Sequence, residues 1–123
     1  MNCNCNCNGG GLEYNGTFVG TVLKYKVEIT AEGFSMDEDD FKIVIRRGNQ
    51  SVTLDKSDLI IHEVEASGSG EETVTEYYML VDTAALGAGK YEVITYAYVP
   101  DDDVEGGIRQ EITKQELIPV NAL

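Results

Sequence analysis

The sequence predicts an all-β protein: an antiparallel immunoglobulin-like β-sandwich of about seven strands. Segments in which apolar and polar residues alternate recur along the chain, and this alternation is typical of strands with one buried face. Turns rich in glycine or acidic residues separate these segments at regular spacing, as in sandwiches with short connections. No segment has the 3.6-residue apolar period of an amphipathic helix. The pattern therefore favours two packed sheets.

The predicted strands follow one another from residue 23 to the C-terminal region. They are expected at Leu23–Ala31, Phe41–Arg47, Ser51–Leu54, Leu59–Val64, Thr73–Val81, Tyr91–Val99 and Ile108–Ile118. The last of these carries charged residues that discourage edge-to-edge pairing, which predicts an edge strand. If residues 51–64 instead form one kinked strand, the count falls to six.

The segment Val81–Pro100 organises the expected fold, because it joins two strong strand patterns through one compact corner. Leu86 supplies an apolar residue in the corner, and Gly87 and Gly89 close it with backbone conformations that other residues rarely adopt. Tyr91 follows directly, where its hydroxyl can bond back to the corner's backbone. This spacing predicts a tyrosine corner.

Residues 1–22 are expected to form a flexible Cys/Asn/Gly-rich arm in front of a domain in residues 23–123. Cys3, Cys5 and Cys7 alternate with asparagine, so their thiols would share one side of an extended chain. Soft metal ions accept thiolates, but a structural zinc site needs four ligands. We assign no metal and no cofactor here; a tail docked on a partner and intermolecular disulfides remain alternatives. Asn15-Gly16 within Leu12–Val22 predicts a small hairpin, or an arm that adds to a neighbour's sheet edge.

The charge and hydropathy of the chain exclude two classes of partner. It has 22 acidic and 9 basic residues, for a formal charge of −13, and such a surface repels a phosphate backbone. No apolar run reaches the roughly 20 residues of a membrane-spanning helix. The first residues lack the basic region and apolar core of a secretory signal. We expect no nucleic-acid partner, no membrane partner and synthesis in the cytoplasm.

Two acidic loops are candidate calcium sites, because calcium prefers oxygen ligands. Their carboxylates are those of Asp37, Glu38, Asp39 and Asp40 in one loop, and of Asp101, Asp102, Asp103 and Glu105 in the other. A seven-strand order is expected to place the loops at opposite ends of the sandwich, and a six-strand order to bring them together. Neither loop has the spacing of the helix-loop-helix calcium motif. We therefore expect solvated turns and assign no metal site.

His62, the only histidine, is the one candidate for a catalytic base. A nucleophile and an orienting group would have to accompany it, and neither can be assigned. Phosphate-binding loops, metalloprotease motifs and dinucleotide fingerprints are missing from the sequence as well. We expect no catalytic residues and a protein that is not an enzyme; a metal-handling enzyme that uses the cysteines is the weakest alternative.

Three segments carry a resemblance to a known class of proteins: Phe34–Gly48 (FSMDEDDFKIVIRRG), Val81–Asp103 (VDTAALGAGKYEVITYAYVPDDD) and Gly106–Lys114 (GGIRQEITK). Together they resemble small β-sandwich structural proteins of crAss-like and related tailed phages of gut Bacteroidetes. The resemblance implies a virion component assembled in the bacterial host cytoplasm. An auxiliary protein that decorates the capsid is expected first, bound to the major capsid protein or other virion proteins through its arm and a sandwich edge. A head-fibre, collar or tail component is the alternative role. A homo-oligomer is also possible under either role.

A second hypothesis is a carbohydrate- or cell-surface-binding adhesion module. Tyr96 and Tyr98 lie on the second face of the strongest strand pattern, where exposed rings would stack on sugars. Alternatively, the rings simply fill that face of a central strand.

Overall fold

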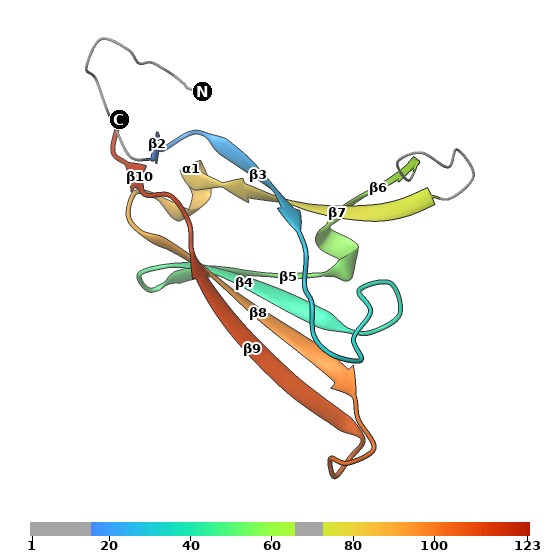
Figure 1. Cartoon of the computed structure of the whole chain (residues 1–123). Helices are drawn as coiled ribbons and strands as arrows, with labels where there is room; N and C mark the ends of the chain where they lie inside the picture. The colour runs from blue at the N-terminus through green and yellow to red at the C-terminus, as the bar shows by residue number, and fades with distance from the viewer. Residues whose placement is uncertain (1–15, 66–72) are drawn as a thin grey trace.

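The computed structural model describes residues 16–65 and 73–123 of the chain (Figure 1). Its elements are β2 (Thr17–Phe18), β3 (Val22–Val27), β4 (Phe41–Arg47), β5 (Gln50–Asp55), the 3-10 turn η1 (Lys56–Asp58), β6 (Ile60–Glu65), β7 (Thr73–Asp82), the one-turn helix α1 (Thr83–Leu86), β8 (Tyr91–Pro100), β9 (Ile108–Glu116) and β10 (Val120–Asn121). The prediction of an all-β protein is confirmed.

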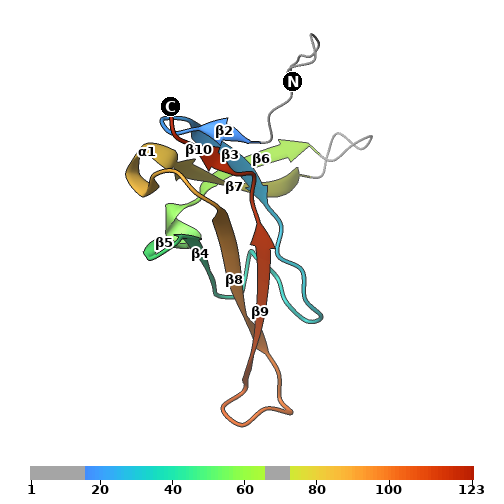
Figure 2. The ribbon, with the colours of Figure 1, turned by 90° about the vertical axis from the view of Figure 1, so that its left-hand side faces the viewer.

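Two antiparallel sheets form the body of the molecule. One has the strand order β3-β7-β6 and the other β5-β4-β8-β9, and β2 pairs in parallel with β10. Figure 2 shows the long β8–β9 hairpin extending away from the strands of the smaller sheet. Residues 51–64 do not form one kinked strand, because η1 interrupts them and β5 and β6 belong to different sheets. A capping box between Asp55 and Asp58 starts this turn.

The inner faces of the two sheets share one hydrophobic core. Odd-numbered residues of β4 and β8 face inward, as alternation predicts, and so do those of β7. The buried apolar residues are Val27, Phe41, Ile43, Ile45, Leu59, Tyr77, Met79, Val81, Leu86, Tyr91, Val93, Ala97, Val99 and Val120. Leu23 and Tyr25 of β3 are only half-buried, because β3 lies at the edge of its sheet.

Strand β3 ends at Val27, although alternation predicted a strand through Ala31. Beyond this point the chain leaves the ladder and makes local contacts with the next loop. The backbone N–H of Ile29 donates to Sδ of Met36 (3.4 Å), and the ring of Phe34 packs edge-on against that of Phe41. These contacts take the place of strand pairing, since alternation alone does not report which residues have a partner strand.

The N-terminal part of the described chain is tied to the C-terminal part. The backbone N–H of Thr17 donates to the carbonyl oxygen of Pro119 and that of Val19 to the carbonyl oxygen of Asn121, both at 2.9 Å. Residues 16–22, which were assigned to the arm, therefore contact the sandwich. Residues 12–15 of the predicted hairpin lie outside the described residues, and the described remainder pairs with β10.

The tyrosine corner predicted at Tyr91 is confirmed. Its hydroxyl donates to the carbonyl oxygen of Gly87 at 2.6 Å, and burial raises the pKa of this phenol. Two further side chains hold the same corner. Buried Thr83 donates its hydroxyl to the carbonyl oxygen of Thr21 (2.5 Å), and Nε of Arg47 donates to the carbonyl oxygen of Leu86 (2.6 Å). The corner therefore anchors strands of both sheets.

Candidate functional site

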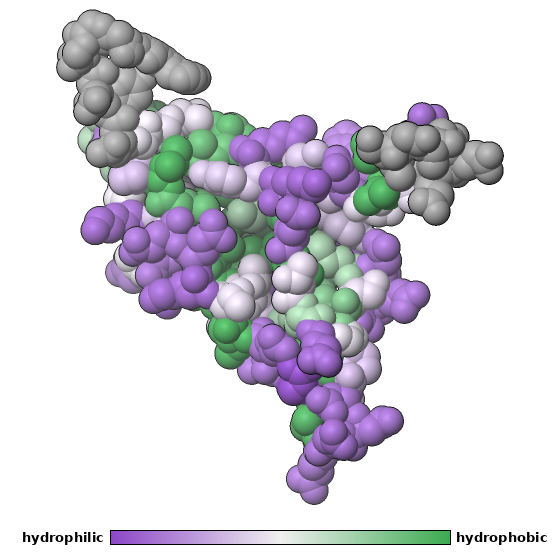
Figure 3. Space-filling view, in the orientation of Figure 1, coloured by the Kyte–Doolittle hydropathy of each residue, from purple (hydrophilic) through white to green (hydrophobic). Residues whose placement is uncertain are grey.

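A groove lies between the edges of the two sheets, along β3 and the residues that follow it on one side and β8 and β9 on the other. It consists of two neighbouring cavities of about 240 and about 120 Å³. Both are lined by Glu28, Ile29 and Thr95, so they are continuous. Figure 3 shows apolar surface between hydrophilic groups in the middle of this face.

The groove exists because two sheet edges are left without partners in the described part of the chain. There, β3 pairs only with β7, and β9 pairs only with β8. The sheets meet over the core, and among the described residues the backbones of β3 and β9 do not pair. The side chain of Arg109 on β9 reaches the carbonyl oxygen of Glu32, which follows β3. Core side chains of Ile43, Met79 and Val93 consequently line the larger cavity.

The rim of the groove is predominantly acidic. Glu28 lies on the β3 side and Glu111 on the β9 side. The one cation of the rim, Lys26, forms an ion pair with Glu76 at 3.0 Å, and hydrogen bonding to Lys26 is the main reason that the pKa of Glu76 is lowered. Glu111 is itself paired with Arg109, so Glu28 is the rim carboxylate that a basic side chain entering the groove would approach.

This geometry suits binding of an extended peptide. A sheet edge offers backbone groups to an added strand, and pockets beside it accept alternate side chains. The stretch from Lys26 to Ala31 lines the groove over about 20 Å. Its first two residues belong to β3 and offer a strand edge, and the residues after Val27 supply the side chains beside it. No sequence pattern predicts this groove, because it depends on which strands lack a neighbour.

His62 lies exposed on β6. Its ring packs edge-on against that of Tyr78, with the ring centroids 5.4 Å apart, while the Tyr78 hydroxyl donates to Glu76. This is an aromatic packing contact on the surface of a strand, and it does not pair the imidazole with a nucleophile.

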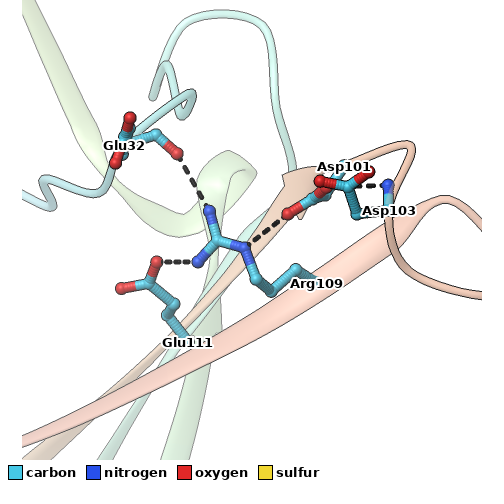
Figure 4. A network of polar contacts seen from close by, with 5 residues as sticks. All are labelled: Glu32, Asp101, Asp103, Arg109 and Glu111. Carbon is cyan, nitrogen blue, oxygen red and sulfur yellow. Dashed lines mark hydrogen bonds and ion pairs between the residues drawn. The ribbon is translucent and has the colours of Figure 1, made fainter.

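The two acidic loops lie at the same end of the sandwich, so the prediction that a seven-strand order separates them is wrong. Strand β8 runs antiparallel to β4, and therefore the loop before β4 and the loop after β8 share an end. The backbone N–H of Tyr98 donates to the carbonyl oxygen of Asp40 (3.0 Å). Arg109 joins the loops more directly (Figure 4): Nε donates to Asp101 (2.9 Å) and Nη2 to the carbonyl oxygen of Glu32 (3.0 Å), and Nη1 contacts Glu111.

Several carboxylates of these loops bond to protein donors. Asp37 accepts from the hydroxyl of Tyr77, and burial together with this bond raises the pKa of Tyr77 to about 12. Asp39 accepts from the backbone N–H of Ser35 (2.8 Å). The backbone N–H of Asp103, and then Arg109, hold the pKa of Asp101 below its usual value.

The described residues include no group of three or more histidine, cysteine, aspartate or glutamate side chains placed to hold a metal ion. The residues Cys3, Cys5 and Cys7 lie outside the described ranges, so the structure does not address their role.

We therefore expect the melting temperature in calcium to be no higher than the melting temperature in magnesium at equal ionic strength. Both ions would act by screening the charge of −13. Melting curves of the full chain in a few millimolar of each salt test this, with the double variant Asp101→Ala, Asp103→Ala as the control. A rise in melting temperature specific to calcium and lost in the double variant would contradict the expectation, since a bound ligand stabilises by mass action.

Tyr96 and Tyr98 lie half-buried on the outer face of the four-stranded sheet. They therefore do not fill a second core. The ammonium group of Lys42 sits 4.6 Å from the centroid of the Tyr96 ring. One face of that ring is thus already covered by a cation.

The chain matches no protein-family model, no curated protein and no solved structure. None of the helices among the described residues has the length and apolarity to cross a bilayer. We therefore infer function from the groove and from the outer surfaces of the sheets.

Proposed function

We propose that this chain is a non-enzymatic structural protein of a tailed-phage virion, an auxiliary protein that decorates the capsid. It attaches by accepting an extended segment of a capsid protein in the groove between β3 and β9. The groove is the observation that supports this role, because it combines an open strand edge with an apolar floor. Binding of this kind needs main-chain pairing and side-chain pockets, and no reactive group.

We also propose that the sandwich is of the immunoglobulin-like type. The sheet orders β3-β7-β6 and β5-β4-β8-β9 support an immunoglobulin-like sandwich in which β3 to β9 would be the seven strands. The hydroxyl of Tyr91, bonded to the backbone at the β7–β8 corner, supports this assignment. Small rigid domains of this type suit repeated attachment to a symmetric shell.

Charge supports the choice of partner segment and of an outward orientation. The apolar floor of the groove favours a segment with alternating apolar residues. Glu28 on the rim favours a lysine or arginine in that segment, whereas Glu111 is already paired with Arg109. The formal charge of −13 would keep decorated particles soluble and apart. We infer that the acidic loops at the far end of the β8–β9 hairpin face solvent.

Mass spectrometry of purified particles tests the proposal. The chain is expected in the particles at a copy number comparable to that of the shell protein, whereas one or a few copies would indicate a fibre, collar or tail position. Its absence from particles would refute a virion role altogether.

Attachment through the groove can be tested separately with Thr113→Arg. Thr113 lines the groove and is exposed, so a long side chain there should block an incoming strand without disturbing the core. Incorporation into particles should fall at least about tenfold, equivalent to about 1.4 kcal/mol. Thr73→Arg, which adds the same charge at an exposed position of β7, is the matched control. Equal incorporation of both variants would rule out the groove as the attachment site.

Carbohydrate binding is the second candidate, because Tyr96 and Tyr98 are partly exposed on a flat sheet face. Lys42 over the Tyr96 ring counts against stacking on a sugar at that ring. A glycan array probed with the full chain tests carbohydrate binding. Specific binding that is lost in Tyr98→Ala would favour an adhesion module.

A further inference from the structure

The outer face of the four-stranded sheet is a surface that the groove does not use. The pairing register places both side chains of every second cross-strand pair on this face. Its central rows are Lys42, Tyr96 and Ile112, followed by Val44, Ile94 and Lys114. Tyr98, Gln110, Pro100 and Ile108 continue the face toward the end of the β8–β9 hairpin. Apolar and aromatic groups therefore run across three neighbouring strands.

Two isoleucines of this face are unusually accessible. Ile112 is 53% exposed and Ile108 is 50% exposed, and Ile112 stands directly opposite Tyr96 in the ladder. Single exposed apolar residues are ordinary, but a contiguous patch marks an interaction surface. Tyrosines in such a patch supply much of the binding energy of protein interfaces.

The charge on this face differs from that of the molecule as a whole. Its cations are Lys42, Arg46 and Lys114, and its anions are Asp55, Glu92 and Glu116. These six charges sum to zero, whereas the whole chain has a formal charge of −13. Glu92 pairs with Arg46 at 2.7 Å and with Lys114 at 3.1 Å, which lowers its pKa. A second, equally acidic copy can therefore approach this face without the repulsion that it would meet at the acidic loops.

We propose that two copies of the chain pack through this face in a two-fold dimer. Two-fold packing brings the same patch of each copy together, so the cations of one copy can face the anions of the other. Four strands about 4.8 Å apart and about eight residues long cover roughly 500 Å² per copy. The total of about 1,000 Å² lies at the lower limit for a specific interface. The dimer is thus weak and depends on concentration.

The outer face of β3-β7-β6 is the competing surface. Its charges also balance, Lys24 and Lys26 against Glu76 and Asp82. However, it spans three strands rather than four, so it buries less area. Leu80 on this face is 48% exposed, which makes it a close match to Ile112 for a control.

Sedimentation velocity of the full chain, with a reducing agent to prevent disulfides, tests the dimer. Between about 1 and about 200 µM, the weight-average mass is expected to rise from 13.5 kDa toward twice that value. Ile112→Glu should weaken association at least about tenfold, because it puts a charge at the centre of the apolar face. Leu80→Glu, with the same added charge, should leave association within about twofold of the unmodified chain.

Three outcomes would overturn the proposal: a chain that stays monomeric to about 200 µM, equal effects of the two variants, or loss of association only in Leu80→Glu. Melting curves establish that both variants are folded, which is expected because both positions are exposed. Association that persists in Ile112→Glu but is lost in Thr113→Arg would assign self-association to the groove instead.

Discussion

Gly89→Val is expected to lower the free energy of unfolding by about 2 to 6 kcal/mol. Gly89 has φ of +141°, and a Cβ atom there would lie 2.7 Å from Cδ of Arg47. The strained backbone costs about 1 to 3 kcal/mol and the crowding a similar amount. A backbone movement could relieve this crowding, but the two hydrogen bonds between Gly89 and Val120 oppose it.

Urea denaturation of this variant and of Gly106→Val separates the two costs. Gly106 also has positive φ, at +90°, but a Cβ atom there would meet nothing within 4 Å. The free energy of unfolding of Gly106→Val should therefore fall only by the cost of backbone strain, about 1 to 3 kcal/mol. Equal losses in the two variants would show that Arg47 moves aside without cost and that the close packing of the corner is unimportant.

Tyr91→Phe is expected to cost about 1 to 3 kcal/mol, because it leaves the part-buried carbonyl oxygen of Gly87 without its donor. Tyr98→Phe is the matched control, since Tyr98 is a half-buried tyrosine of the same strand that points to the outer face. Its hydroxyl should contribute less than about 0.5 kcal/mol. The difference between the two unfolding free energies measures the contribution of the Tyr91 hydroxyl to the corner. A difference within about 0.5 kcal/mol would mean that the other contacts of the corner hold it without this hydrogen bond.

The tyrosine corner was predictable because its defining hydrogen bond is local. Tyr91 and its acceptor, Gly87, are four residues apart, so spacing and the glycines carry the information. The strands β4 and β8 were predictable for a similar reason: alternation is a property of each segment by itself. Their inward residues, such as Ile43 and Val93, are buried as expected.

The end of β3 and the partner of residues 16–22 were not predictable in this way. Alternation continues to Ala31, yet pairing stops at Val27, because the ladder depends on a second strand that the segment does not specify. Likewise, Asn15-Gly16 predicts a turn locally, while the C-terminal residues Pro119 and Asn121 decide where the following residues dock.

The sequence by itself determined which segments are strands, where the chain turns and which side chains of each strand face the core, because these follow from local periodicity and backbone preference. Only the tertiary structure decided that the two acidic loops share one end and that β3 and β9 leave a groove open above Met79. It also decided that a face with no net charge exists on a strongly acidic molecule. Each of these features depends on pairing between residues distant in the chain, and periodicity within one segment contains no information about its neighbours.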